Sequence, residues 1–385
     1  MNIEGTKNKW QKQRKISMVL VNILHMNNGD GESSYANNSL IQETGIRKAI
    51  PYLKCSIKGM ANYDVFNDCF TVADLGCSSG SNTLLVASNI IDIVHDICQE
   101  NNRKVPQFQV CLNDLFENDF NAIFKLLPDF YAKVKQDKGK SFGPCFVSAV
   151  PGSFYDRLFP DRSLHFVHAA NSNHWLSQVP QGLEKNGRNI FMAKTSPPNV
   201  YQAYGKQFRN DFIKFLQMRS EEVIRGGSMV LTIPARSIVD PTTDDCCALL
   251  ELLGQSLVDM LKEGLVQESD IISFNVPVYF PCEDEIRNVI ESEGSFSLET
   301  MNNFRVNWDP QDTDYTNMSD SNEFNQIHGK NTSKVIRAVI EPLLISHFGS
   351  SIVDVLFKNF GNHVAEYLSK KKTRIFFITI SLTKK

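Results

Sequence analysis

A glycine- and serine-rich turn between residues 75 and 82 constrains the fold of this chain more than any other feature. Residues 70–75 form a short apolar run that breaks at Gly76, and apolar residues at helical spacing begin at Asn82. Glycines in such a turn let a ligand approach the backbone closely, and the helix N-terminus adds oriented N–H groups. The segment therefore predicts a buried strand, a ligand-binding turn and a helix.

Short apolar strands alternate with helices along much of the chain. Strands are expected at residues 70–75, 107–112, 145–150, 164–168, 229–234 and 374–382. Helices are expected at residues 40–54, 82–100, 121–127 and 202–223. This alternation predicts an α/β fold with a doubly wound, mostly parallel, Rossmann-like sheet, which the last strand closes.

The remaining segments suggest a division into a sheet domain and a cap. Helical periodicity over residues 244–301 and 333–367 predicts an α-helical cap, and the polar residues 309–332 predict a mobile loop. We expect a disordered leader at residues 1–20, a ligand-binding α/β domain from residues 21–235 and 374–385, and a mainly helical cap from residues 236–373.

Composition excludes several classes of protein. A net charge of −3 provides no basic field for nucleic acid or an anionic membrane. No run of about 18 apolar residues predicts a membrane span, and the basic leader lacks the apolar core of a secretory signal. The nine cysteines contain no C-x-x-C pair, so they predict neither zinc nor a disulfide framework. These features are typical of a cytoplasmic protein.

The spacing of the glycine turn bears on its ligand. A nicotinamide cofactor favours G-x-G-x-x-G, whereas this turn has Asp74 before Gly76 and the next glycine at Gly80. An acid at that position suits the cationic amino-acid end of S-adenosylmethionine and would repel a phosphate. Asp114 follows the next strand, where a carboxylate can accept both ribose hydroxyls. A dinucleotide or a structural turn, and a helix N-cap for Asp114, remain as alternatives.

These motifs and others make the chain resemble the plant SABATH methyltransferases, which esterify salicylate, jasmonate and related acids or N-methylate xanthines in the caffeine branch. The resemblance runs from about residue 21 to the C-terminus, and its middle is most like the jasmonate type. The motifs include SYANNS at 34–39, ADLGCSSG at 73–80, NDL at 113–115, PGSFY at 151–155, RLFP at 157–160, LHFVH at 164–168 and WLSQVP at 175–180.

The resemblance implies S-adenosylmethionine as cofactor, a small carboxylic acid as substrate and a homodimer. It implies cofactor contacts at Tyr35, Asp74, Cys77, Asn82, Asp114, Leu115, Ser153 and Phe154. It also implies that Gln42 and Trp175 hold the substrate carboxylate. Their amide and indole N–H groups are neutral donors, which orient a carboxylate without strong charge pairing. The alternatives are an exposed helix residue for Gln42 and a core aromatic residue for Trp175.

The chain departs from the family pattern around the substrate. Asn171, Asn173 and His174 stand where relatives carry Tyr or Ser, then Leu, then Met, Gln or His, and Leu250 replaces a frequent Trp. The expected substrate pocket comprises Gln42, Asn171, His174, Trp175, Leu249, Leu250 and Phe357. A magnesium site of some xanthine-type members would fall on Asn186, Ile272, Phe274 and Asn275. Ile272 replaces its carboxylate, which argues against a metal ion.

The expected reaction is methyl-ester formation on a carboxylic acid. Such an acid, with a pKa near about 4, is already ionised at neutral pH, so no catalytic acid or base is needed. His174 is the only candidate base, and a role as a pocket hydrogen-bond donor is favoured.

The polar residues that differ from the family pattern bear on which class of substrate is predicted. If residues after His168 are helical, Asn171 shares a face with His174 and Trp175, whereas Asn173 is solvated or capping. A polar or nitrogen-containing acid, such as an alkaloid-precursor keto acid of plant specialised metabolism, is therefore favoured. The alternatives are a jasmonate or salicylate carboxyl methyltransferase, a xanthine N-methyltransferase, or a non-catalytic binding protein. A non-catalytic binding protein would keep the cofactor turn and lose the Gln42–Trp175 pair, whereas this chain has both.

Overall fold

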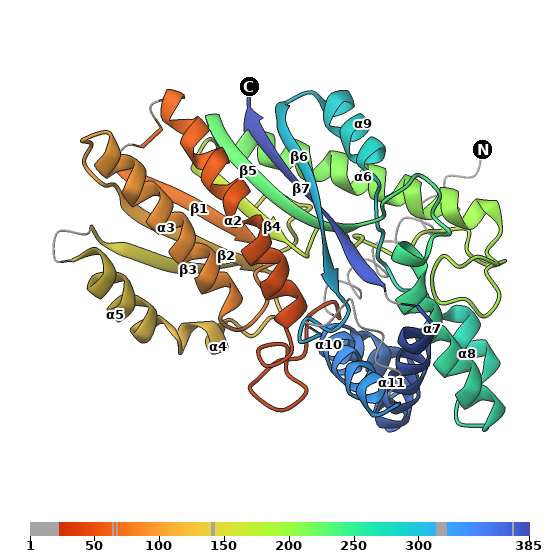
Figure 1. The fold of residues 1–385 in the computed structure, drawn as a ribbon. Helices are drawn as coiled ribbons and strands as arrows, with labels where there is room; N and C mark the ends of the chain where they lie inside the picture. The colour runs from red at the N-terminus through yellow and green to blue at the C-terminus, as the bar shows by residue number, and fades with distance from the viewer. Residues whose placement is uncertain (1–22, 64, 67, 140–142, 313–321, 372) are drawn as a thin grey trace, which may run out of the picture.

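A seven-stranded sheet forms the centre of the molecule (Figure 1). The computed structural model describes residues 23–385, apart from residues 64, 67, 140–142, 313–321 and 372. The predicted leader therefore lies outside the described residues. The strands run in the order β3-β2-β1-β4-β5-β7-β6. Their bounds are β1 Cys69–Leu75, β2 Gln107–Asp114, β3 Cys145–Pro151, β4 Leu164–Ala170, β5 Val223–Ala235, β6 Phe296–Asn307 and β7 Arg374–Lys384.

The sheet is mostly parallel, which confirms the predicted fold class. Strands β1 to β5 pair in parallel, and β7 runs antiparallel between β5 and β6. The prediction of helix as far as Met301 is wrong at β6, and β6 rather than β7 closes this edge. Among the described residues β6 pairs only with β7, so tertiary pairing decides the conformation of a segment whose sequence is also compatible with a helix.

Helices cover both faces of the sheet, so its central strands are buried and apolar. On one face lie α2 Leu40–Met60, α3 Asn82–Glu100, α4 Phe120–Phe124 and α5 Leu127–Lys138. The opposite face packs against α6 Pro198–Glu222, whose Phe208, Phe212 and Phe215 are buried. The prediction of α3 is confirmed at both ends, whereas α5 was not predicted.

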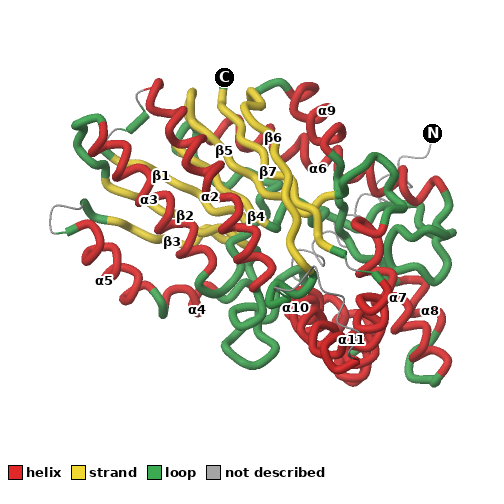
Figure 2. Tube along the Cα trace, in the orientation of Figure 1, coloured by secondary structure: helices red, strands yellow, loops and turns green. Residues whose placement is uncertain are grey.

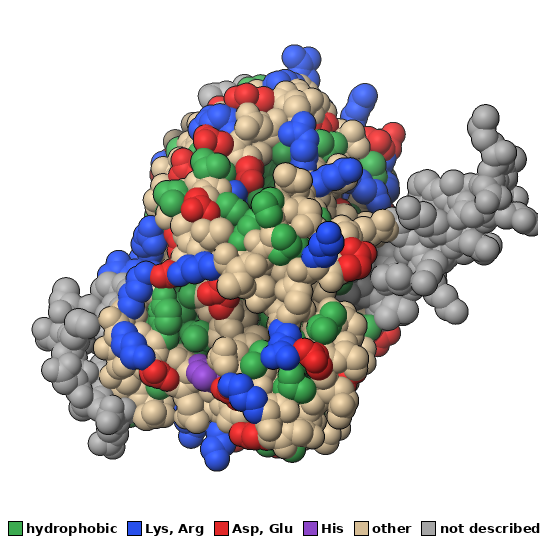
Figure 3. All heavy atoms as spheres, turned by 90° about the vertical axis from the view of Figure 1, so that its right-hand side faces the viewer, with side chains coloured by type: hydrophobic (Ala, Val, Ile, Leu, Met, Phe, Trp, Pro, Cys, Tyr) green, Lys and Arg blue, Asp and Glu red, His purple; other side chains and the backbone are tan. Residues whose placement is uncertain are grey.

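Helices at one end of the sheet form the cap, which Figure 2 shows below and to the right of the strands. They are α7 Asp244–Lys262, α8 Glu268–Ser273, α10 Asn322–Phe348 and α11 Val353–Lys370; α9 Glu283–Glu293 instead packs beside α6 and β6. Helix α10 begins inside the range that was expected to be a loop. None of the helices among the described residues is long and apolar enough to cross a bilayer. Basic and acidic side chains are interspersed on the face in Figure 3.

Candidate active site

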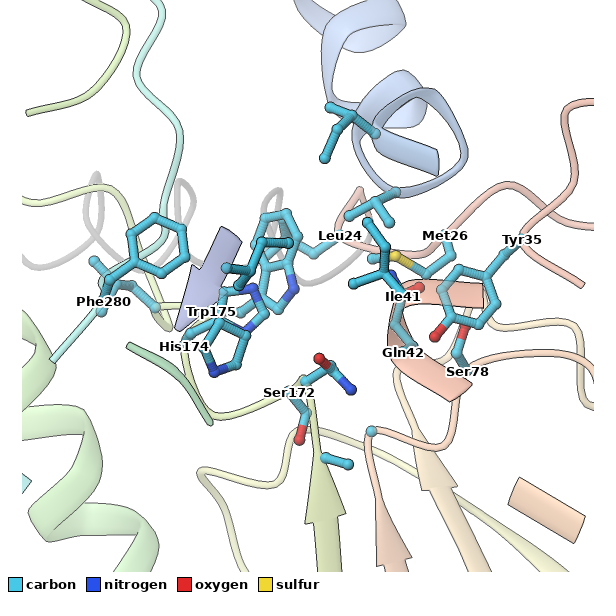
Figure 4. A pocket seen from close by; sticks show the side chains of 18 of the residues that line it. Leu24, Met26, Tyr35, Ile41, Gln42, Ser78, Ser172, His174, Trp175 and Phe280 are labelled. Carbon is cyan, nitrogen blue, oxygen red and sulfur yellow. The ribbon is translucent and has the colours of Figure 1, made fainter. Parts of the chain in front are cut away.

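A cavity of about 210 Å³ lies between the strand ends, α2 and the cap. It joins two groups of side chains that sequence reasoning assigned to different ligands. Figure 4 shows His174, Trp175 and Phe280 on one side and Tyr35 and Ser78 on the other, with Gln42 between them. We call these two sides the substrate end and the cofactor end of the cavity.

The glycine turn after β1 forms part of the cofactor end. Gly76 has a φ of +73°, and a Cβ there would lie 2.4 Å from the Cβ of Ser172. Gly80 has a φ of +106°, and a Cβ there would approach the Cα of Ala36 to 3.1 Å. Only glycine tolerates both the left-handed backbone and the close neighbours. The turn is therefore packed between the end of β4 and the N-terminal segment.

The carboxylate of Asp114, at the end of β2, faces the same space. Its Oδ2 accepts a 2.7 Å hydrogen bond from the Ser78 N–H, and its Oδ1 accepts one of 2.8 Å from the Leu115 N–H. Each oxygen keeps a further lone pair for a ligand hydroxyl. Burial raises the pKa of Asp114 to about 6. The alternative of an N-cap is wrong, because Asp119 caps α4 by accepting from the Ala122 N–H.

Four of the other expected cofactor residues line the cavity, namely Tyr35, Leu115, Ser153 and Phe154. The structure does not bring Asp74, Cys77 or Asn82 to the cavity wall. Asp74 instead accepts hydrogen bonds from Thr83 Oγ1 at 2.6 Å and pairs with His168 Nδ1 at 2.7 Å, so both its oxygens are used inside the protein.

Asn82 has an indirect link to the cavity. Its Nδ2 donates a 3.0 Å hydrogen bond to the Ser39 hydroxyl. Ser39 immediately precedes α2, and Gln42 lies in the first turn of that helix. The hydrogen bond thus ties the helix after the glycine turn to the helix that carries Gln42.

A buried ion pair that sequence reasoning missed holds the loop carrying Ser153 and Phe154. Arg219 and Glu222 on α6 are fully buried and paired at 2.6 Å. Arg219 donates to the Phe154 carbonyl at 2.6 Å, and Glu222 accepts from the Leu158 N–H at 2.6 Å. An i, i+3 Arg–Glu spacing is a common surface pattern, so the sequence provides no sign of this burial.

The N-terminal segment also contributes to the wall through Leu24 and Met26. It is anchored to α10, because the Asn27 N–H donates to the Ala338 carbonyl at 2.9 Å and Asn27 Nδ2 donates to Glu341. No local sequence pattern places this segment, because the partners of Asn27 on α10 lie more than 300 residues further along the chain.

The substrate end combines apolar walls with a few polar atoms. Apolar side chains that line the cavity include Leu24, Ile41, Leu249, Leu250, Phe280 and Trp308. Three polar atoms are buried and have no hydrogen-bond partner among the described residues, namely Gln42 Oε1, Asn171 Nδ2 and His174 Nδ1. Burial lowers the pKa of His174 to about 3, so its imidazole is neutral at physiological pH. Phe357 packs against Arg337 and is not brought to this wall.

The conformation of the segment after β4 differs from the predicted helix. Residues 171–175 form turns rather than a helix, and Asn171 adopts a φ of +58°. Asn171 and His174 nevertheless both line the cavity. The expectation of a solvated or capping Asn173 is wrong, because this side chain is 2% exposed and neither of its amide atoms has a partner in the part of the chain that the structure describes.

Trp175 is held on both sides of its backbone. Its N–H donates to the Ser172 carbonyl at 3.0 Å, and its carbonyl accepts a 2.6 Å hydrogen bond from the Tyr155 hydroxyl. It also forms an isolated bridge with Val278. Tyr155 belongs to the loop that carries Ser153, so the same loop contributes to the cofactor end and holds Trp175 at the substrate end.

The weak metal candidates serve other roles or stay buried. Asn186 donates to the carbonyls of Asn189 and Phe191 and accepts from Ser196. Phe274 is buried, and Asn275 keeps a buried Oδ1 without a partner. Among the described residues, the structure brings together no group of three or more His, Cys, Asp or Glu side chains that could hold a metal ion.

Comparison with known proteins identifies the family. A family model described as SAM-dependent carboxyl methyltransferase matches residues 21–385. A benzoic acid/salicylic acid carboxyl methyltransferase of Petunia hybrida is 44% identical over 95% of this chain and 99% of its own length. The chain belongs to the plant SABATH family of S-adenosylmethionine-dependent carboxyl methyltransferases.

Two further relatives agree with this assignment. The jasmonate O-methyltransferase of Arabidopsis thaliana is 42% identical over 95% of this chain and all of its own length. The solved structure of a loganic acid methyltransferase with SAH has a TM-score of 0.80 and 30% identity, covering 94% of this chain and 98% of that one. This SABATH enzyme therefore uses S-adenosylmethionine as its methyl donor.

Proposed function

We propose that this SABATH enzyme forms the methyl ester of a small carboxylic acid that carries a second polar or nitrogen-containing group, such as an alkaloid-precursor keto acid. The observation that carries the proposal is the substrate end of the cavity. There Trp175 lies together with two further polar side chains, Asn171 and His174, and Gln42 lies at the boundary with the cofactor end.

The cofactor end supports the placement of the methyl donor. Asp114 keeps lone pairs for two ribose hydroxyls, and the glycine turn, which is packed against Ser172 and Ala36, holds the Ser78 N–H against this carboxylate. We assign Tyr35, Leu115, Ser153 and Phe154 to the same ligand because they line this end. When bound, S-adenosylmethionine supplies a methyl group on a positively charged sulfur. We assign Asp74, Cys77 and Asn82 supporting positions behind this wall.

The pair of Gln42 and Trp175 is suited to orient the acid. An amide N–H₂ and an indole N–H donate to carboxylate oxygens without a full positive charge, so the nucleophile keeps its electron density. Orientation alone can contribute up to about 7–11 kcal/mol in favourable cases. The ionised acid needs no base, and a His174 with a pKa near 3 is poorly suited to act as one at neutral pH.

Asn171 and His174 support the second polar group on the substrate. A buried polar atom without a partner costs about 1–3 kcal/mol, and Asn171 Nδ2 and His174 Nδ1 are two such atoms. A purely hydrocarbon side chain would leave that cost in place. A carbonyl, hydroxyl or ring nitrogen on the acid would remove part of it.

The proposal is tested with labelled S-adenosylmethionine and a panel of acids. The panel contains salicylate, jasmonate, loganic acid, nicotinate and an aromatic 2-keto acid, together with xanthines. We expect the highest kcat/KM on an acid with a keto group or ring nitrogen, and a product that loses its label on saponification. Fastest turnover of jasmonate or salicylate would contradict the choice of substrate.

Xanthine N-methylation is the second candidate, because Asn171 and His174 also suit the polar edge of a purine ring. It does not require the carboxylate pair. The same panel separates the two reactions, since a methyl ester is cleaved by base whereas an N-methyl group is retained.

A further inference from the structure

A second hollow lies beside the cavity, on the surface of the molecule. Its charged side chains are Lys194, Arg305, Lys371 and Arg374, with Asp244 and Asp245. We call this hollow the basic cleft. Four basic side chains face two acidic ones, although the protein as a whole carries a net charge of −3. The cleft is therefore a local region of positive charge on a protein of negative charge.

The basic cleft and the cavity share a wall. Asp244 and Asp245, in the first turn of α7, line both hollows. At the start of β7, Arg374 lines the cleft and the next residue, Ile375, lines the cavity. This is the alternation expected of successive strand residues. Single side chains therefore separate the cleft from the substrate end of the cavity.

The shared wall is built from ion pairs between these acidic and basic side chains. Asp244 accepts from Lys194 Nζ at 2.6 Å and also pairs with Lys371. These hydrogen bonds, first from Lys194 and then from Lys371, lower the pKa of Asp244 to about 2, so it stays ionised. Asp245 accepts from the Thr243 hydroxyl at 2.6 Å and has Arg305 at 3.9 Å.

The two lysines that pair with Asp244 are accessible to an anion from the solvent. Lys194 and Lys371 have side chains that are 58% and 55% exposed, so both keep a large contact with water. A carboxylate that enters the cleft can therefore approach both ammonium groups from the solvent side while Asp244 stays in place.

We propose that the basic cleft is the entrance through which the anionic substrate reaches the cavity, and that Lys194 and Lys371 attract its carboxylate. The proposal rests on the carboxylic acid substrate of the proposed function. A net-negative protein repels an anion at long range, whereas a positive cleft beside the cavity raises its local concentration. Steering of this kind increases capture by about 10- to 1000-fold and weakens with ionic strength.

The test compares the double variant Lys194→Gln/Lys371→Gln with the control Lys133→Gln. Lys133 lies on α5 in an exposed pair with Asp137, so its neutralisation changes charge away from the cleft. With the panel acid that the wild type turns over fastest, we expect kcat/KM of the double variant to fall about 3- to 10-fold at low salt. At about 1 M salt, where charges are screened beyond roughly 3 Å, the two variants should agree within about twofold.

Two further measurements exclude simple damage to the protein. The KM for S-adenosylmethionine should be unchanged, and so should the inhibition constant of the methyl ester product, which has the same skeleton without the charge. A loss of kcat/KM that persists at high salt, or an equal loss in Lys133→Gln, would overturn the proposal that the basic cleft is the substrate entrance. If the wild type methylates no acid of the panel, the proposed function fails instead, and the salt series is run as binding of the same acids.

Discussion

The two ends of the cavity are built in different ways. At the cofactor end, backbone N–H groups of Ser78 and Leu115 hold the Asp114 carboxylate, and Asn118 binds the Ser78 carbonyl at 3.0 Å. At the substrate end, side chains from α2 and from the turns after β4 bring polar atoms that have no partner. One end is preorganised by the backbone, and the other is completed by its ligand.

This difference matches two kinds of ligand, the cofactor that all members of the family share and the acid that each member selects. A cradle of backbone groups depends on few residue identities, chiefly the glycines, and suits a ligand common to all members. A wall of side chains changes with every substitution. We therefore expect changes at the cofactor end to act on the fold and on cofactor affinity, and changes at the substrate end to act on the choice of acid.

The largest effect is expected at the cofactor end, for Gly76→Ala. A Cβ at this left-handed position costs about 1–2 kcal/mol in backbone strain, and its 2.4 Å approach to Ser172 costs about 1–3 kcal/mol more. Urea unfolding should show the loss. Gly59→Ala in α2 is the control, because a Cβ there meets no atom within 4 Å and should be neutral or stabilising. Similar stabilities of the two variants would contradict the packed turn.

Asp114→Asn should weaken binding of S-adenosylhomocysteine by about 2–4 kcal/mol, because two charge-assisted acceptors are replaced by one neutral acceptor. Calorimetry measures this change, with the exposed Asp129→Asn as control. Unchanged affinity in a folded variant would remove Asp114 from the cofactor site.

The raised pKa of Asp114 adds a pH test of the same assignment. Since that pKa is about 6, a fall in pH from 7 to 5 protonates the free carboxylate and removes its ability to accept both hydroxyls. The dissociation constant of the wild type should therefore rise as pH falls, by up to about tenfold per pH unit below 6. In Asp114→Asn the dissociation constant should stay flat over this range.

At the boundary between the two ends, Gln42→Glu should lower kcat/KM on the acid by more than Gln42→Ala does. Alanine removes a donor, at a cost of about 1–3 kcal/mol, whereas glutamate also places a negative charge against the substrate carboxylate. Affinity for S-adenosylhomocysteine should stay within about twofold in both variants. If Gln42→Glu were the more active of the two, Gln42 would not face the carboxylate.

The sequence predicts the positions of the glycine turn and of Asp114 at their strand ends because the determinants of these positions are local. The turn from Gly76 to Gly80 and the acid after β2 lie within segments whose apolar runs define strand ends. The cavity as a whole depends on residues as far apart as Leu24, Gln42, Leu250 and Trp308, and no local pattern brings these together. For the same reason β6 was expected to be helical, since only its pairing with β7 makes it a strand.

The smallest effect should appear at the substrate end, in the selectivity of Asn171→Ser/His174→Met. This variant removes two of the unpartnered polar groups that line the cavity, while Gln42 and Trp175 remain. We expect kcat/KM to rise on jasmonate or salicylate and to fall on the native acid, each by about tenfold, equivalent to about 1.4 kcal/mol.

Asn173→Leu provides the control for this selectivity change, because Asn173 is buried in the same turns but does not line the cavity. Replacing its two unpartnered amide atoms should change the free energy of unfolding and leave the ratio of kcat/KM between the acids unchanged. A shift of that ratio in Asn173→Leu alone would mean that turn geometry sets selectivity. The unpartnered atoms of Asn171 and His174 would then have no part in recognising the substrate, and the contrast between the two ends of the cavity would lose its functional meaning.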